Sequence, residues 1–182
     1  MALDIGTLAV KAQGYKKVLE NTVEYRKAWA SQMKPLIIET LEEILKLTDI
    51  KGKINVEDKI DNLEAVILDL GKSSSGIHEI LDDTNIKRTM IKSNGALIYQ
   101  QLFNGKVMIM MVNPYIEGYG EPKPPKPLEI LRPEELKAGF IIRHMETFLK
   151  EITEWEDYDD DEPAKKDAFT PIGFNKIIEQ VD

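Results

Sequence analysis

Cysteine is absent from this chain of 182 residues, and histidine occurs only twice, at His78 and His144. Without cysteine the chain can form no disulfide, thiolate metal site, iron–sulfur cluster or cysteine nucleophile, and this composition suits a reducing compartment. The two histidines lie far apart in the sequence, and no other catalytic motif accompanies them. We therefore expect no cofactor and no metal site, and the pattern favours a non-enzymatic protein over an enzyme.

Long apolar runs are missing as well. No stretch approaches the 18 apolar residues that a membrane-spanning helix needs. The first residues, MALDIGTLAVKAQG, contain Asp4 and have no basic region ahead of their short apolar part, which is not the pattern of a secretory signal. We expect a cytoplasmic protein with no membrane partner.

The chain also has no excess of basic residues. The formal net charge is -8, and the last third of the chain, residues 121–182, holds 16 acidic and nine basic residues. Nucleic-acid binding requires a basic face that replaces counterions on phosphates, so we expect no nucleic-acid partner. The length and a hydrophobic content of 42% allow a single domain over residues 1–182 that buries roughly 70% of its unfolded surface.

Residues 1–51 are predicted to be helical. Apolar residues recur there at intervals of three and four, which is the period of an amphipathic helix. Pro35 lacks a backbone donor and its ring clashes one turn back, so a kink or break is expected near residues 32–34. The residues of this predicted stripe are Leu8, Ala12, Tyr15, Leu19, Thr22, Trp29, Met33 and Leu36.

Residues 54–113 are predicted to form an antiparallel sheet of four to six strands. The pairs Asn94-Gly95 and Asn104-Gly105 are strong hairpin signals, because both central residues of a type I′ turn need positive φ. They predict a meander with strands at 86–92, 96–103 and 106–113. Further strands are expected at 63–70 and 77–81, before a turn at 82–85, while 54–60 fits either a strand or a helix.

Two-residue turns would also fix the register of this meander. Tyr99 would then oppose Met110, and Gln101 would oppose Met108. One face would be almost entirely apolar, with Ile91, Ala96, Ile98, Leu102, Val107, Ile109 and Met111. The other would hold Met90, Leu97, Tyr99, Phe103, Met108, Met110 and Val112 together with Arg88, Lys92, Gln101 and Lys106.

The rest of the chain is predicted to be a connection followed by helices. Residues 114–132 are rich in proline and glycine and are expected to be extended, Pro133 is expected to open a helix over 133–156, and 157–169 is an acidic linker. A short helix is expected over 170–181, with an apolar face of Phe174, Ile177, Ile178 and Val181. These elements together predict an α+β fold with long N-terminal helices, an antiparallel meander and C-terminal helices packed on the sheet.

Three short motifs resemble known sites without completing them. Gly-Lys-Ser at 71–73 lacks the glycine that a phosphate loop needs at Val66, and His78-Glu79 lacks a second histidine at Asp82. The acidic run after Glu156 fails the calcium-loop pattern twice. His144 lies on an apolar helical stripe and is interpreted as a packing histidine. One weak anion-binding candidate remains, a nest of backbone amides in a predicted hairpin loop formed by Gly71, Lys72, Ser73, Ser74, Ser75 and Gly76.

The methionine-rich sheet face is the main functional candidate. Methionine side chains adapt to varied partners, so this face could pack under the protein's own helices, form a homodimer interface or line a pocket. Our leading hypothesis is a non-enzymatic protein that self-associates or binds a protein partner through this face. The alternative is a small-molecule or anion-binding protein, or an enzyme, that uses Arg88, Lys92 and Tyr99 or the Gly71–Gly76 loop. The candidate residues on the face are Arg88, Met90, Lys92, Tyr99, Gln101, Met108 and Met110.

Overall fold

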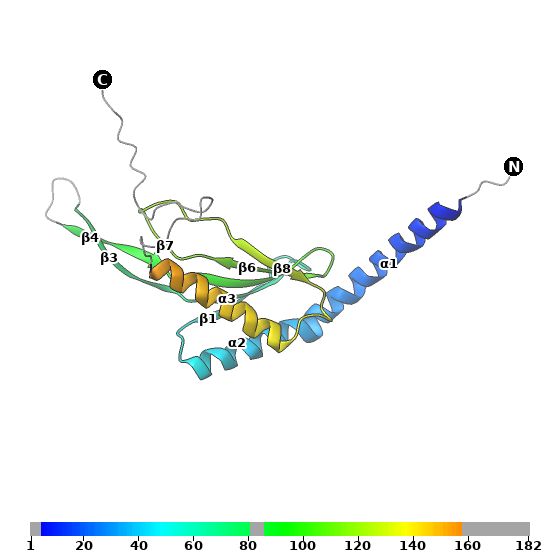
Figure 1. Cartoon of the computed structure of the whole chain (residues 1–182), viewed down its shortest axis with the longest axis horizontal. Coiled ribbons are helices and arrows are strands. Elements are labelled where there is room, and N and C mark those ends of the chain that lie inside the picture. The colour runs from blue at the N-terminus through cyan, green and yellow to red at the C-terminus, as the bar shows by residue number, and fades with distance from the viewer. Residues whose placement is uncertain (1–4, 81–85, 158–182) are drawn as a thin grey trace, which may run out of the picture.

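The computed structural model describes residues 5–80 and 86–157, in which helices precede and follow an antiparallel sheet region along the chain (Figure 1). This is the α+β class that the sequence predicts. The turn expected at 82–85, the linker after residue 157 and the helix expected at 170–181 lie outside the described residues. The helical elements are α1 (Gly6–Ala28), the π-helical turn η1 (Trp29–Met33), α2 (Lys34–Thr48) and α3 (Ala138–Glu156). The strands are β1 (Lys53–Glu57), β2 (Ala65–Asp69), β3 (Lys72–Ile80), β4 (Lys87–Ser93), β5 (Ala96–Gln101), β6 (Val107–Val112), β7 (Tyr115–Ile116) and β8 (Lys126–Leu131).

The expected break in the N-terminal helix is present as the π-helical turn η1. This turn ends immediately before α2, in which Pro35 occupies the first turn. A π turn inserts one extra residue, which relieves the clash that a proline ring makes with the preceding turn of an α-helix. Trp29 and Met33, both in the turn, point into the core.

The strands form two sheets that share one long bent hairpin. The orders are β1-β2-β5-β6-β8 and β3-β4-β7. Asp69 pairs with Ala96 in the first sheet and Lys72 with Ser93 in the second, and these two pairs belong to a single register. The bend lies at Gly71 and Gly95, whose φ angles are 77° and 94°. The ladder continues across it, because the amide of Leu70 donates to the carbonyl of Gly95 and the amide of Asn94 to that of Gly71.

Two predictions for this region were therefore wrong. Asn94-Gly95 does not close a hairpin between 86–92 and 96–103, and Gly71–Gly76 is not a hairpin loop, because residues 72–76 belong to β3. A glycine at positive φ occurs in bends and bulges as well as in tight turns. The sequence alone therefore does not distinguish these structures. Residues 54–60, which the sequence left open, contain strand β1.

The β5–β6 hairpin is present, but its register differs by one residue from the prediction. Tyr99 pairs with Ile109 and Gln101 with Val107. The loop is longer than two residues, since the amide of Leu102 donates to the carbonyl of Lys106, and Gly105 has a φ of 77°. A shift of one residue turns every side chain of the strand to the opposite face. The predicted faces are therefore wrong, because Met108 and Met110 lie on the face opposite to Tyr99.

The proline-rich connection contributes to both sheets. Strand β7 joins the small sheet, and β8 pairs with β6 at the edge of the large one. Pro127 is compatible with this place because an edge strand does not need every amide for the ladder. The connection predicted to be extended over 114–132 thus also contains two strands that were not predicted, and the helix predicted to start at Pro133 begins instead at Ala138.

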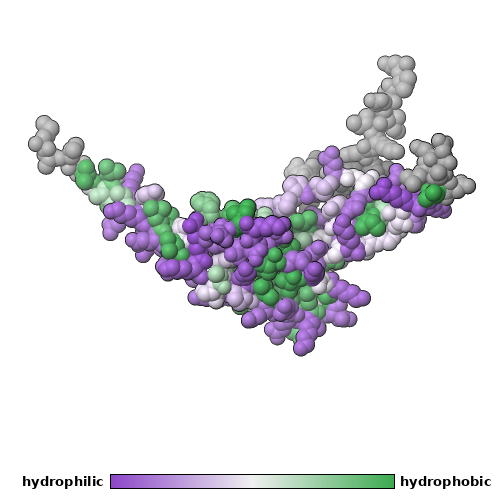
Figure 2. All heavy atoms as spheres, turned by 180° about the vertical axis from the view of Figure 1, so that it is seen from behind, coloured by the Kyte–Doolittle hydropathy of each residue, from purple (hydrophilic) through white to green (hydrophobic). Residues whose placement is uncertain are grey.

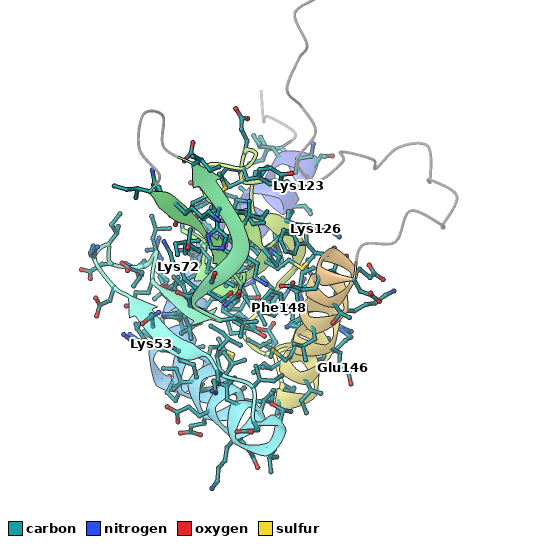
Figure 3. The ribbon with its side chains drawn as sticks, turned by 90° about the vertical axis from the view of Figure 1, so that its left-hand side faces the viewer. Lys53, Lys72, Lys123, Lys126, Glu146 and Phe148 are labelled. Carbon is teal, nitrogen blue, oxygen red and sulfur yellow. The ribbon has the colours of Figure 1, made fainter. Side chains whose placement is uncertain are left out.

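The core lies between one face of the large sheet and the helices. Figure 3 shows α2 and α3 on the same side of the sheet, with Phe148 between α3 and the strands and Glu146 on the outer side of the helix. The opposite face, which we call the outer sheet face, carries Ile67, Ile98, Met108 and Met110, all half-buried. The largest buried side chains on the helix-covered side are Trp29, Tyr99, Phe148, Ile37, Leu41, Leu68, Leu97, Ile109, Met111, Leu136 and Ile141.

Candidate functional site

A polar cluster interrupts the apolar core where α3 crosses the large sheet. The hydroxyl of Tyr99, on β5, lies 3.2 Å from Nδ1 of His144 on α3. Nε2 of His144 is hydrogen-bonded to the carboxylate of Glu129 on β8, and Arg143 donates to the same carboxylate. A carboxylate only accepts hydrogen bonds, so Nε2 carries the proton and Nδ1 accepts from the Tyr99 hydroxyl. The packing histidine expected from the sequence is thus fully buried, with both ring nitrogens engaged.

Burial sets the protonation of this cluster. Burial lowers the pKa of His144 below its ordinary value, although Glu129 acts in the opposite direction. Burial also raises the pKa of Glu129, but hydrogen bonds from His144 and Arg143 outweigh it and leave that pKa lowered. The pKa of Tyr99 is raised, first by burial and then by the charge of Glu129. A neutral tyrosine, a neutral imidazole and a carboxylate form a satisfied chain that ties α3 to β5 and β8.

Two shallow hollows of the described surface lie away from this cluster. One, of about 600 Å³, runs along α1 and is bordered on one side only, by residues of that helix between Ala9 and Glu20. The other, of about 290 Å³, lies between α1, η1 and the segment that carries Pro133 and Glu134. Neither has the enclosed shape, with converging polar groups, that is typical of ligand pockets. Within residues 5–80 and 86–157, no cluster of three His, Asp or Glu side chains could hold a metal ion.

The residues predicted for the methionine-rich face lie in three separate places. Arg88, Met90 and Lys92 belong to β4 of the small sheet, where Nζ of Lys92 lies 2.5 Å from the carboxylate of Glu156 and 5.9 Å from the ring of Trp155. Tyr99 and Gln101 point into the core, and Oε1 of Gln101 is buried with no hydrogen-bond partner in the part of the chain that the structure describes. Met108 and Met110 lie on the outer sheet face.

The residues of the predicted anion-binding nest lie at the bend and in β3. The amide of Gly71 donates to the carboxylate of Asp69, and that of Gly76 to the hydroxyl of Ser74. The hydroxyl of Ser75 donates to the carbonyl of Met90, and Nζ of Lys72 lies 2.5 Å from a carboxylate oxygen of Glu117. Ser73 donates to the side chain of Asn94. Several donors of the segment already have protein acceptors, two of which are carboxylates.

Helix α1 carries many of the large apolar side chains that are exposed in the described part of the chain. None of its 23 residues is buried, and Figure 1 shows it extending away from the body to one side. Its apolar residues include Leu8, 63% exposed, Tyr15, 66% exposed, and Leu19, 49% exposed. We call the set Ile5, Leu8, Ala12, Tyr15 and Leu19 the α1 stripe. The same helical face continues to Trp29 and Met33, which are buried. Its C-terminal end therefore packs in the core, whereas its N-terminal end is exposed to solvent.

The base of α1 is fixed to the body at the β5–β6 loop. The guanidinium of Arg26 donates to the carbonyl of Phe103, with Nη2 at 2.6 Å. A side chain at Gly105 would come within 2.6 Å of Cβ of Tyr25, so the loop and the helix touch there. Beyond this anchor, toward its N-terminus, the helix makes no contact that buries a side chain.

The charges of α1 are arranged unevenly around the stripe. The helix has five basic and two acidic residues. With Leu8 and Tyr15 at the d positions of a heptad, Lys11 and Lys16 occupy the flanking g and e positions. Glu20 and Glu24 fall at b and f, on the far side of the helix. The stripe is therefore flanked by Lys11 and Lys16 in its N-terminal half, and by the exposed Val18 and Val23 at the next g and e positions.

Figure 2 shows the molecule from behind relative to Figure 1, from the side opposite to α3. Hydrophobic side chains lie in the centre of this view between hydrophilic ones. No helix in the described part of the chain has the length and apolar character that crossing a bilayer requires.

The apolar stripe of this helix was predicted from the sequence, but it was not predicted to be a site. The period of three and four correctly indicated a helix with an apolar face, but it carries no information about what packs on that face. The lysines beside the stripe were the available signal. Comparison with protein-family models, with curated proteins and with solved structures gave no match.

Proposed function

We propose that this is a non-enzymatic protein that binds an acidic amphipathic helix of a protein partner on the α1 stripe. The observation that carries the proposal is the exposure of Leu8, Tyr15 and Leu19 on a helix that projects from the body. Burying one large apolar side chain completely contributes roughly 1.5–3 kcal/mol. Covering these three side chains is therefore a substantial driving force for a partner.

The borders of the stripe favour an acidic partner. A helix laid along the stripe would place its own flanking residues next to Lys11 and Lys16. Acidic residues at those places would form ion pairs, whereas basic ones would repel. The charge arrangement adds selectivity more than affinity, because exposed ion pairs contribute at most about 1 kcal/mol.

The outer sheet face is the weaker candidate for such a contact. Its side chains Ile67, Ile98, Met108 and Met110 are already half-buried, whereas Leu8 and Tyr15 of the α1 stripe are more than 60% exposed. The proposal therefore keeps the protein–protein role expected from the sequence but moves the contact from the sheet to α1.

A synthetic peptide tests this function directly. The probe is a 21-residue helix with leucine at a and d and glutamate at e and g, whose like charges oppose its own association. Its binding to the full chain is followed by fluorescence anisotropy, with a second peptide carrying lysine at e and g as the charge control. We expect the acidic peptide to bind at least tenfold more tightly than the basic one.

Two matched variants locate the contact. Leu19→Glu places a charge in the stripe, and Val10→Glu places the same charge on another side of the same helix, where Val10 is 71% exposed. Leu19→Glu should weaken binding of the acidic peptide at least tenfold, and Val10→Glu should change it less than threefold. Equal binding by both variants, or equal binding of the two peptides, would overturn the proposed function.

A further inference from the structure

We infer that the helix bound by the α1 stripe is the C-terminal segment, residues 157–182, of a second copy of this chain. The inference rests on the proposed function and names its partner. It draws on the exposed stripe, on the charge and pattern of a segment outside the described residues, and on the place in the fold where that segment begins.

The C-terminal segment carries a charge opposite to that of α1, chiefly in the acidic linker that precedes its predicted helix. Residues 157–182 contain eight acidic and three basic residues, and the run Asp157–Glu162 has five acids in six positions. Helix α1 has five basic and two acidic residues. The segment is thus the most acidic part of the chain, and the projecting helix carries an excess of the opposite charge.

The segment also has an apolar stripe of its own. Phe174, Ile177, Ile178 and Val181 recur at helical spacing, and Thr170-Pro171 is a typical helix start. A helix of this length, about 12 residues, is marginal in water unless it packs against something. The α1 stripe offers an uncovered apolar surface of matching kind.

Pairing of α1 with α1 is the competing arrangement, and the lysines oppose it. In a parallel pair, a g residue faces the e residue five positions later on the partner helix. Lys11 would then face Lys16 of the second copy, twice per pair. In an antiparallel pair, g faces g, so Lys11 faces Lys11 of the second copy when the two stripes align around that residue.

A second copy is favoured over the same copy by where the segment begins. Figure 1 shows the C-terminal end of α3 at the opposite end of the body from the free end of α1. A second molecule can bring its segment to α1 from outside, and two copies that exchange segments reciprocally form a closed dimer.

An anionic membrane is the other surface that a basic helix could meet. Membrane-surface helices separate their apolar and polar sides strongly. Helix α1 does not, since Val10 is exposed on a different side from the stripe. We therefore place the protein partner ahead of the lipid.

The absence of cysteine makes the test clean. One chain carries Ala12→Cys in the stripe, a second chain of different tag carries Val181→Cys, and the two are mixed at low concentration and oxidised gently. We expect a mixed disulfide at least tenfold more abundant than with Val10→Cys in place of Ala12→Cys. Adding Ile178→Glu to the second chain should reduce it at least tenfold, whereas Gln180→Glu, on another side of the predicted helix, should not.

Other outcomes would overturn the inference. The first is that no mixed disulfide forms, and the second is that Ala12→Cys and Val10→Cys give equal yields. The third is that a disulfide forms only within a single chain that carries both Ala12→Cys and Val181→Cys. A fourth is that the wild-type chain sediments with phosphatidylcholine–phosphatidylserine vesicles while Leu19→Glu does not. That result would show that the stripe binds lipid instead of a second copy. Binding of the acidic peptide without a mixed disulfide would leave the proposed function standing and remove only this partner.

Discussion

The Tyr99 hydroxyl lies 3.2 Å from Nδ1 of His144, and both side chains are almost completely buried. Tyr99→Phe would remove the only hydroxyl in this contact and leave a buried ring nitrogen without its donor. The free energy of unfolding should fall by about 1–3 kcal/mol, the usual cost of such an unpaired group. Urea denaturation measures it. The control Tyr15→Phe, on the exposed part of α1, should change stability by less than about 0.5 kcal/mol, and an equal effect of both would contradict the assignment.

Stability should also depend on pH through His144. In the folded protein its pKa is lowered from 6.5, chiefly by burial, so below that pH the unfolded chain binds a proton that the folded chain does not. Stability therefore decreases as pH falls from about 7 through 6.5 toward the folded pKa. Glu129, whose folded pKa is lowered from 4.5, adds a loss in the same direction at more acidic pH.

The measurement is the urea midpoint at pH 7.5, 6.5 and 5.5 for the wild type and His144→Gln. Glutamine does not titrate, so the variant should be less stable at pH 7.5 but lose less stability between pH 7.5 and 5.5. Parallel pH profiles for the two chains would show that His144 is not the group responsible.

The register of the β5–β6 hairpin places Met110 and Met111 on opposite faces of the sheet, so lysine at these two positions should affect stability very differently. Met111 is completely buried, so Met111→Lys should cost roughly 4 kcal/mol or prevent folding, because it places an unpaired charge in the core. Met110 lies half-buried on the outer sheet face, and Met110→Lys should cost less than about 1 kcal/mol. Thermal melting of the two variants distinguishes them. The reverse order would restore the register predicted from the two-residue turn.

Alanine should destabilise the protein at Gly95, in the bend of the long hairpin, but not at Gly14, in α1. A Cβ at Gly95 would lie 2.8 Å from the carbonyl oxygen of Val112, and φ there is +94°. Gly95→Ala should therefore cost at least about 2 kcal/mol. At Gly14, in α1, nothing lies within 4 Å of the added atom, so Gly14→Ala should leave stability unchanged or raise it by up to about 1 kcal/mol. Denaturation midpoints of the two variants provide the comparison.

The helices and strands could be predicted from the sequence because each depends on local periodicity. The spacing that includes Trp29 and Met33 indicated a helix, and Pro35 located its break. Alternation and branched residues indicated the strands around Tyr99. These signals act over a few residues and are the same in any fold, which is why the α+β class was predicted correctly.

The pairing of strands could not be predicted with the same accuracy. Asn104-Gly105 fits a two-residue turn and a longer loop with glycine at positive φ equally well, and the two differ by one residue of register. Asn94-Gly95 fits a turn and a bend in the same way. What covers each face follows from this register, so Tyr99 and Met110 were placed on one face although they lie on opposite ones.

The bend at Gly71 and Gly95 also decides how the small sheet acquires its order. Strands β3 and β4 contain no buried side chain, and they are continuous with β2 and β5 through the hydrogen bonds across the bend. The small sheet therefore has almost no core of its own and depends on the large one as a template. Local opening should begin near Ile80 and Lys87 and become progressively more costly toward the bend, so amide hydrogens are protected in order of their distance from the glycines. The two glycines thus separate a part of the backbone that opens only with global unfolding from a part that opens on its own.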